Sequence, residues 1–320
     1  MNRLPKVSII ILTWNQLKLT LEELENIAKL ETKGLKAETI VVDNGSKDGT
    51  AEKLKGYKLS NMPFKLIANN KNLGFAGGNN VGIKDVLKSG VDYILLLNND
   101  VILPKDLLLQ LIKVLESDNK IGLLAPKMYF AKGYEFHKDR YKEKDLGRVI
   151  WYAGGDIDWD NVYSTHRGVD EVDRGQYEIQ EETDFVNGAC VLIRRKVFED
   201  VGFLNERHFL YWEDADYSMR AKRAGWKVAY TPSTYLWHKV AQASGIGSDL
   251  NDYFLTRNRM LFGMRYARMR TKIALIRESI KLLLIGRKWQ KIAVRDFYLG
   301  RFGRGSWSSA RKNSGEKEND

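Results

Sequence analysis

The sequence predicts an α/β protein with a mainly parallel central sheet flanked by helices and a helical extension at its C-terminal end. Two observations carry this prediction. Short apolar runs alternate with segments of helical spacing through the first hundred residues, and a basic stretch with helical spacing follows residue 250. With 320 residues, 43% of them hydrophobic, and only five prolines, the chain has enough apolar material for one large domain plus an extension.

Four apolar runs bounded by polar turns stand near the start of the chain, and each is typical of a buried strand. They are Val7–Leu12, Thr39–Val42, Lys65–Ala68 and Tyr93–Leu97. The segments between them have helical spacing and are Leu17–Leu30, Thr50–Lys55 and Ala76–Lys88. This alternation predicts parallel strands joined by right-handed crossovers.

Polar residues follow each of these four runs. They form the segments Thr13–Asn15, Asp43–Ser46, Asn69–Asn80 and Asn98–Asp100. Ligands of open α/β sheets bind beyond the carboxyl ends of the strands. We therefore expect the four segments to meet at one edge of the sheet and to form the functional site.

The pattern changes after residue 130. Residues 131–183 are rich in charged residues and glycine, which predicts an irregular insertion with a hairpin. An apolar pattern returns over Asp184–Ile193 and is followed by Lys196–Val201, a helix over about 214–224 and a short strand over Lys227–Tyr230. Asn251 to about Gly300 predicts a helical hairpin, and the polar residues 307–320 predict a disordered tail.

The net charge of +11 comes from the C-terminal part of the chain. Residues 1–250 hold 35 Lys+Arg against 35 Asp+Glu, whereas residues 251–312 hold 16 basic against 3 acidic side chains. No nucleic-acid motif accompanies this charge, so we expect no nucleic-acid partner. The single cysteine, Cys190, excludes an intrachain disulfide and predicts a buried apolar side chain in a cytoplasmic protein. No apolar stretch reaches the length of a membrane span.

Asp43 ends the second strand in VVDNGSKDGT, where a fixed carboxylate suits the imide N–H of a uracil or thymine ring. A DNG turn with a helix cap explains the same residues, so both interpretations stay open. The later NKNLGFAGGNN brings glycines to a strand-to-helix junction, where backbone amides can approach a nucleotide. It is neither a GxGxxG nor a Lys-bearing phosphate loop, and a plain glycine-rich helix start is its alternative.

The run DYILLLNNDV ends abruptly in polar side chains, which need partners at the end of a buried strand. A divalent cation that holds a diphosphate would be such a partner, with Asp100 as its ligand and Asn98 nearby or on a ribose. A cap on the turn before Pro104 is the alternative.

WEDADYSMRAKRAG brings Glu213, Asp214 and Asp216 to a helix N-terminus, whose dipole keeps a carboxylate ionised. Such a carboxylate can take the proton of an attacking hydroxyl, although a helix start by itself also attracts acidic residues. His238 stands alone after TPSTYLW, and a lone histidine is more often structural than a metal ligand.

Together these segments resemble glycosyltransferase family 2, the inverting enzymes with the GT-A fold, and especially its rhamnosyltransferase-like and galactofuranosyltransferase-like members. The resemblance covers roughly residues 6–240 through six motifs in order. They are VSIIILTWNQ, IVVDNGSKDGT, NLGFAGGNN, LLLNND, FVNGACVLIRR and WEDADYSMRAKRAGWKVAYTPSTYLWH. One such motif would be loose, but six in order are specific.

The resemblance implies a role for each matching residue. The residues implied to bind the donor nucleotide are Thr13, Asn15, Asp43, Asn72, Gly74, Asn79, Asn98 and Asn99. The residues implied to bind the acceptor are Asn187, Gly188, Trp212 and Glu213. Asp214 falls on the family's catalytic base.

The resemblance also implies a bound Mn²⁺ or Mg²⁺. Asp100 matches the last acid of the family's DXD motif, whose first acid is Asn98 here. This departure removes one ligand. In similar enzymes a histidine 24 residues beyond the catalytic base supplies a ligand, and His238 lies 24 residues after Asp214.

The implied reaction is an inverting transfer of a sugar from a nucleotide-diphosphate donor to a hydroxyl of a glycan or lipid-linked acceptor, in the synthesis of cell-surface polysaccharide or glycoconjugates. Rhamnose from dTDP-rhamnose is the first expectation, and galactofuranose or another hexose from a UDP-sugar is the second. A nucleotidyltransferase and a non-catalytic glycan-binding protein are the rival interpretations.

The expected domains are a GT-A catalytic domain over 1–240, a basic amphipathic helical extension over 241–306 and the tail over 307–320. Within the first, residues 1–125 would bind the nucleotide and 126–240 the acceptor. Basic amphipathic helices commonly lie on anionic membrane surfaces. The resemblance implies such a peripheral contact, on the cytoplasmic face of the membrane, because similar enzymes often extend lipid-linked glycans. Packing of the extension on the catalytic domain is the alternative, and a homodimer is left open.

Overall fold

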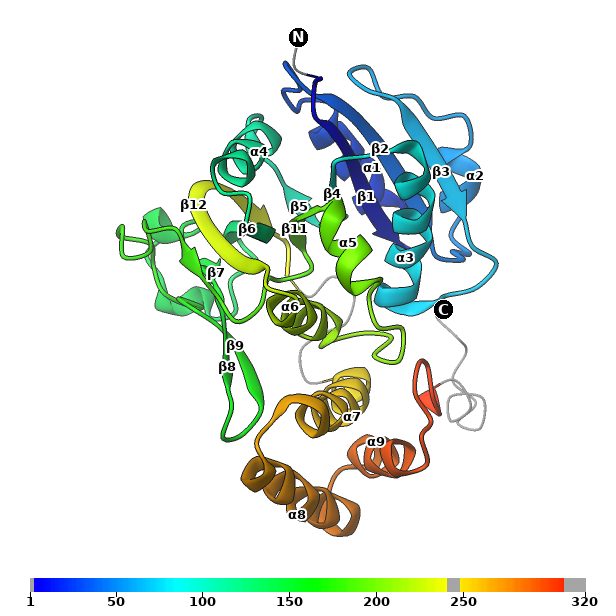
Figure 1. Cartoon of the computed structure of the whole chain (residues 1–320), viewed down its shortest axis with the longest axis vertical. Helices are drawn as coiled ribbons and strands as arrows, with labels where there is room; N and C mark the ends of the chain where they lie inside the picture. Colours follow the sequence, from blue (N-terminus) through cyan, green and yellow to red (C-terminus); the bar gives the residue numbers. More distant parts are fainter. Residues whose placement is uncertain (1–2, 241–247, 308–320) are drawn as a thin grey trace.

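The computed structural model describes residues 3–240 and 248–307 and confirms an α/β fold with a helical extension (Figure 1). Its main sheet has the strand order β10-β12-β6-β11-β4-β1-β2-β3, with β5 beside β12 and β7 beside β6. The strands are β1 (Lys6–Thr13), β2 (Lys36–Asp43), β3 (Phe64–Ala68), β4 (Tyr93–Asn98), β5 (Val101–Ile102), β6 (Ile121–Phe130), β7 (Ile150–Tyr152), β8 (Gly155–Asp158), β9 (Tyr163–His166), β10 (Glu181–Glu182), β11 (Cys190–Arg194) and β12 (Lys227–His238). The α-helices are α1 (Leu17–Ile27), α2 (Thr50–Leu54), α3 (Gly74–Val86), α4 (Leu107–Ser117), α5 (Arg195–Val201), α6 (Glu213–Arg223), α7 (Asp249–Tyr266), α8 (Met269–Ile285) and α9 (Lys288–Tyr298).

The first four strands pair in parallel, as the alternation of apolar runs and helices predicts. β1 lies between β2 and β4, and β3 pairs with β2. Ile9, Ile10 and Ile11 of β1 are fully buried because helices cover both faces of the sheet. The expectation of a buried strand is wrong for β3, whose residues are all exposed or half-buried because it is the edge strand of the sheet.

The sheet is mixed at its centre. β11 runs antiparallel to both β4 and β6, so it joins the first four strands to the parallel pair β6 and β12. Cys190 opens β11 opposite Leu97 and is fully buried, which confirms its expected apolar environment. Burial also raises the pKa of its thiol.

β12 is much longer than the short strand predicted over Lys227–Tyr230. The strand continues to His238, with a shift in register between Thr231 and Tyr235 where Pro232 interrupts the ladder. Its last residues also pair with β5, so that His238 lies opposite Val101. The strand therefore carries His238 to the end of β4.

The expected hairpin of the insertion is present as β8 and β9, which pair antiparallel. Its turn residue Val162 is fully buried and packs with Phe262 of α7. Figure 1 shows the hairpin reaching from the sheet toward α7 and α8. The insertion thus connects the sheet to the C-terminal helices.

The described part of the extension forms the helices α7, α8 and α9 rather than a two-helix hairpin. They gather at one end of the molecule beside α6 (Figure 1). The prediction of a disordered tail is wrong for Trp307, which is buried with its ring centroid 4.5 Å from that of Trp289. Residues 308–320 of the tail and residues 241–247 of the extension lie outside the described residues.

Close contact between α3 and the sheet requires a glycine at position 82. A Cβ atom there would lie 2.8 Å from Cγ2 of Ile10 and 3.1 Å from Cγ2 of Val42. Gly82→Val should therefore lower the free energy of unfolding by about 2 kcal/mol, because the buried core cannot absorb the added volume. Urea unfolding measures this change.

Lys84→Val is the matched control, because it brings the same β-branched side chain to an exposed position of the same helix. It should cost much less than Gly82→Val. Helix propensity alone would favour Gly82→Val, because valine is a better helix former than glycine. A Gly82→Val variant that is no less stable than Lys84→Val would therefore contradict the close contact with the sheet.

Candidate active site

The polar segments that follow the first strands do meet at one edge of the sheet. The parallel register sets Thr13 opposite Asp43 and Leu12 opposite Asn98. The ends of β1, β2 and β4 therefore lie side by side, as the sequence predicts. This edge holds most of the residues expected to bind the donor.

Asp43 is fixed in position by the loops around it. Its carboxylate accepts hydrogen bonds from the backbone N–H of Ser46 at 3.2 Å and from the Ser46 hydroxyl. Burial raises the pKa of Asp43, while the hydrogen bonds from Ser46 act in the opposite direction. Asn15, whose φ is 51°, ties β1 to the same loop because its Oδ1 accepts the N–H of Lys47 at 2.7 Å. The result is a positioned carboxyl group at the strand end.

The glycine-rich turn is organised around Asn72. Its Oδ1 accepts hydrogen bonds from the N–H of Gly74 at 2.8 Å and from Nδ2 of Asn44 at 3.0 Å. Gly74 has a φ of 76°, and a Cβ atom there would lie 2.4 Å from the carbonyl oxygen of Phe209. Asn79 sits one turn into α3 and donates to the carbonyl of Phe75 at 3.0 Å. Only glycine fits at position 74 in this packing.

The three polar residues that end β4 have different environments. Asn99 donates to the hydroxyls of Thr13 at 3.2 Å and Thr20 at 3.1 Å in a buried network. The side chain of Asn98 makes no hydrogen bond within the part of the chain that the structure describes, and it is half-buried. Thr13 and Asn99 thus hold the strand ends together, and Asn98 keeps its polar atoms available.

Asp100 and His238 come together although 138 residues separate them in the chain. His238 Nε2 lies 2.9 Å from Asp100 Oδ1, and both side chains are buried. The N–H of Lys239 donates to the carbonyl of Asp100 at 2.8 Å, which fixes the end of β12 against this residue. The indole of Trp151 covers the imidazole, with 4.2 Å between the ring centroids.

The donor set of this pair fits a divalent cation. Two neighbouring ligands of an octahedral ion at about 2.1 Å lie about 3 Å apart, which matches the separation of the two side chains. Among the described residues no group of three His, Cys, Asp or Glu side chains is arranged to hold a metal ion. Two protein ligands suffice for Mg²⁺ or Mn²⁺ where phosphate oxygens and water complete the shell.

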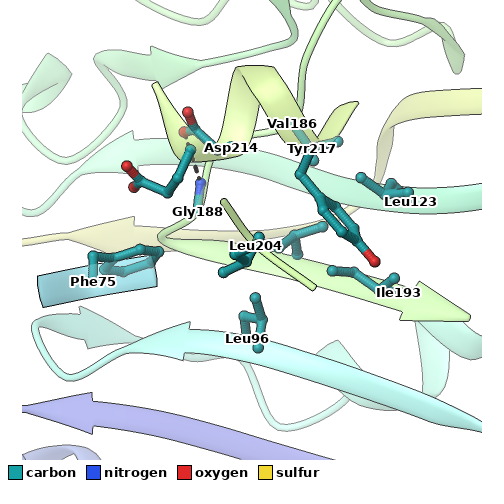
Figure 2. A pocket seen from close by; sticks show the side chains of 11 residues that line it. Phe75, Leu96, Leu123, Val186, Gly188, Ile193, Leu204, Asp214 and Tyr217 are labelled. Atoms are coloured by element: carbon teal, nitrogen blue, oxygen red, sulfur yellow. Dashed lines mark hydrogen bonds between the residues drawn. The ribbon is translucent and has the colours of Figure 1, made fainter. Parts of the chain in front are cut away.

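Asp214 lies at the first turn of α6, above a pocket with an apolar floor. Its Oδ2 accepts the N–H of Gly188 at 3.3 Å, and its Oδ1 accepts the N–H of Ala215 at 2.8 Å. Figure 2 shows Asp214 beside Gly188, with Phe75 on the neighbouring wall and Leu204 below. The carboxylate is thus held by backbone amides at the edge of the pocket.

Burial raises the pKa of Asp214, and the two backbone N–H groups partly offset the effect. Burial also raises the pKa of Glu213 well above its usual range, and the adjacent charge of Asp214 adds to this shift. The Oε2 atom of Glu213 is buried without a hydrogen-bond partner among the described residues. The two neighbouring carboxyl groups therefore resist simultaneous ionisation.

Asn187 is oriented by a histidine that the sequence analysis did not select. Its Oδ1 accepts the N–H of Ala189 at 2.8 Å, and its Nδ2 lies 3.1 Å from Nε2 of His166. Burial lowers the pKa of His166 to about 4, so the ring is neutral. Its Nδ1 then donates to the carbonyl of Trp151 at 3.1 Å, and Nε2 accepts from Asn187. No motif marks His166, because the β8–β9 hairpin carries it in from the irregular insertion.

Glu213→Gln should stabilise the protein increasingly as the pH rises. A glutamate of the unfolded chain ionises near 4.5, whereas the buried carboxyl keeps its proton to higher pH, so the wild type loses stability over that interval. The difference in unfolding free energy, variant minus wild type, should grow as the pH rises above about 4.5 in urea titrations.

Glu25→Gln, at an exposed position of α1, controls for the loss of a carboxylate as such. A Glu213→Gln difference that stays constant with pH would contradict the raised pKa.

Comparisons with known proteins bear on the family and the fold of this chain. The family model described as glycosyl transferase family 2 matches residues 8–202. The low-salt glycan biosynthesis hexosyltransferase Agl10 of Haloferax volcanii is 28% identical over 188 residues, which are 58% of this chain and 54% of that protein. An N-acetylglucosaminyl-diphospho-decaprenol L-rhamnosyltransferase of Mycobacterium tuberculosis is 41% identical over 61 residues, which are 19% of this chain and 20% of that protein.

The chain spans about half the length of the first of these relatives and a fifth of the second. A solved structure of GalNAc-T7 with UDP, GalNAc and Mn²⁺ has a TM-score of 0.60 at 17% identity, and the match covers 93% of this chain and 57% of that one. This likeness shows the GT-A-like fold. Because the family model spans more than half of the 320 residues, the chain belongs to glycosyl transferase family 2.

Proposed function

We propose that this protein transfers a sugar from a nucleotide-diphosphate donor to a hydroxyl of a glycan or lipid-linked saccharide, with inversion at the anomeric carbon, in the synthesis of cell-surface polysaccharide or glycoconjugates. The observation that carries the proposal is the pair Asp100 and His238, 2.9 Å apart at the end of β4. The fixed carboxyl of Asp43 ends a strand of the same parallel set. A nucleotide-diphosphate donor would use both features. Its diphosphate would bind the pair through a cation, and its base would bind Asp43.

The chain's own residues would divide the work on the donor. Asp43 accepts the imide N–H of the base, and the segment of Asn72, Gly74 and Asn79 lies against the ribose and diphosphate. The amide of Asn98 is available to the ribose. Mn²⁺ or Mg²⁺ held by Asp100 and His238 would neutralise the charge that builds up on the departing diphosphate.

Asp214 is the proposed catalytic base. It takes the proton of the acceptor hydroxyl while the oxygen forms its bond to the anomeric carbon, and the bond from that carbon to the diphosphate breaks. A single displacement inverts the configuration. The proposed acceptor contacts lie around the Asp214 carboxylate and are Glu213, Trp212, Asn187 and Gly188. Because Asp214 has a raised pKa, it is a stronger base than an ordinary aspartate.

Rhamnose from dTDP-rhamnose is the first proposed donor, supported by the short match to a rhamnosyltransferase. Galactofuranose or another hexose from a UDP-sugar is the second, supported by the hexosyltransferase relative. Family membership favours glycosyl transfer over nucleotidyl transfer. A non-catalytic glycan-binding protein is the outcome to be tested against.

Release of nucleoside diphosphate from a panel of UDP-, dTDP- and GDP-sugars with Mn²⁺, Mg²⁺ or EDTA tests the proposal. One donor should be turned over in a metal-dependent way, and Asp214→Asn should lower kcat by roughly 10²–10⁴-fold because the general base is lost.

The matched control is Asp85→Asn, which makes the same substitution on the surface of α3 and should leave kcat unchanged. Failure of every donor with every metal would contradict the proposal and favour the binding protein. Turnover that persists in EDTA would contradict the role of Asp100 and His238.

We further propose that α8 rests on the cytoplasmic face of an anionic membrane. Within residues 3–240 and 248–307 no helix is long and apolar enough to span a bilayer. One side of α8 nevertheless exposes a stripe of large apolar residues, although buried Leu275 and Ser279 pack its opposite side. The stripe consists of Met269, Ile273, Ile276, Ile280, Leu283 and Leu284. Arg270, Arg277 and Lys281 follow one border of this stripe and suit acidic lipid head groups.

Sedimentation with vesicles of phosphatidylcholine, with and without phosphatidylglycerol, tests this contact. The wild type should bind the anionic vesicles, and the double variant Ile280→Ser, Leu284→Ser should bind about tenfold or more weakly, because less apolar surface enters the lipid.

Ile179→Ser is the control, since Ile179 is 76% exposed on the insertion and Leu284 is 71% exposed on α8. If the wild type does not bind the vesicles and sediments as a dimer, a second copy of the chain covers the stripe.

A further inference from the structure

The turn of residues 208–212 leads directly into α6 and has an unusual backbone. Phe209, Tyr211 and Trp212 have φ angles of 65°, 67° and 73°, in the left-handed region that favours glycine. Non-glycine residues in this conformation cost free energy and persist only where their surroundings hold them. The turn that carries the proposed base therefore depends on contacts from outside itself.

Asn258 of α7 supplies those contacts. Its fully buried Nδ2 donates to the carbonyls of His208 at 2.7 Å, Leu210 at 2.8 Å and Tyr211 at 3.0 Å. Its Oδ1 accepts from Nε of Arg257 at 3.1 Å. The reversed amide would turn an oxygen toward three carbonyls, so the network settles this orientation. One side chain thus donates to three of the five carbonyls of the turn.

Arg257 fastens the same turn to the rest of the extension. Its guanidinium is fully buried and donates to the carbonyl of His208 at 3.1 Å and to the hydroxyl of Tyr253 at 3.1 Å. That hydroxyl in turn donates to Asp296 of α9 at 2.6 Å. The position of Asn258 is therefore set by α9 as well as by α7.

The opposite side of the turn contacts the glycine-rich start of α3. The carbonyl of Phe209 accepts the N–H of Phe75 at 2.6 Å, and the ring of Phe209 stacks on Phe254 of α7 with 5.2 Å between centroids. The absence of a side chain at Gly74 makes this approach possible. The turn is thus held between the donor side of the site and the C-terminal helices.

We infer that Asn258 is a positioning residue of the active site and that the C-terminal extension is part of the catalytic apparatus. The inference rests on the proposed function of Asp214. Asn258 acts through the backbone: it holds the strained turn, and the turn sets Glu213 and Asp214 at the edge of the pocket. The turn and Asn258 both lie beyond residue 202, where the match to the family model ends.

Asn258→Ala tests the inference through a split between binding and turnover. The Kd of the variant for UDP and for dTDP, each with Mn²⁺, should lie within about twofold of that of the wild type. The reason is that the ends of β1, β2 and β4, where the donor is proposed to bind, stay intact. The kcat for the donor identified above should fall by tenfold or more, because Asp214 is no longer held. Asn258→Ser keeps one hydrogen-bond donor, so its kcat should lie between those of the wild type and Asn258→Ala.

The control is Glu278→Gln, which removes the ion pair with Arg259 that joins α8 to α7 and does not contact the turn. Its kcat should equal that of the wild type. An equal loss in Glu278→Gln and Asn258→Ala would mean general loosening of the extension and would overturn the inference. So would an unchanged kcat in Asn258→Ala.

Hydrogen exchange of the backbone amides in residues 208–216 separates this inference from the proposed function. Exchange there should rise in Asn258→Ala and Asn258→Ser while the amides of β1 and β4 stay protected. A wild type without transferase activity would contradict the proposed function alone. Unchanged exchange in both variants would contradict the positioning role whether or not the protein is active.

Discussion

The parallel register of β1 with β2 and β4 is the constraint on which the rest of the site depends. It aligns the carboxyl ends of three strands, so that Thr13, Asp43 and Asn98 reach the same edge. The strands are buried on both faces, and a shift by one residue would turn every side chain to the opposite face. The hydroxyls of Thr13 and Thr20 and the amide of Asn99 then close this edge with a buried network.

The second half of the site depends on two strands that do not follow the repeating pattern. β11 runs antiparallel between β4 and β6 and carries the segment of Asn187 and Gly188 to the same edge. β12 passes a break in its register and continues until His238 meets Asp100. The site is therefore shared by segments that lie more than a hundred residues apart, and neither half is complete by itself.

Burial and backbone strain meet in the turn before α6. The same packing that buries Glu213 and half-buries Asp214 raises the pKa of both carboxyl groups. It also holds left-handed backbone at Trp212, immediately before them. Burial of this kind lowers stability locally, and the hydrogen bonds from α7 offset part of the cost. The turn before α6 therefore depends on α7, although α7 lies far along the sequence.

Much of the fold was determined by the sequence itself. The alternation of apolar runs with helical spacing indicates the parallel strands and their crossovers, and abrupt polar ends point to Asp43 and Asp100, because these signals are local in the chain. The pairing of Asp100 with His238 was expected only through resemblance, since no local pattern distinguishes a ligand from a structural histidine. Tertiary structure alone decided the edge position of β3, the role of His166 beside Asn187, and the contact of Asn258 with the strained turn. Each of these depends on which segments pack together, and packing between distant segments leaves no periodic trace in the sequence.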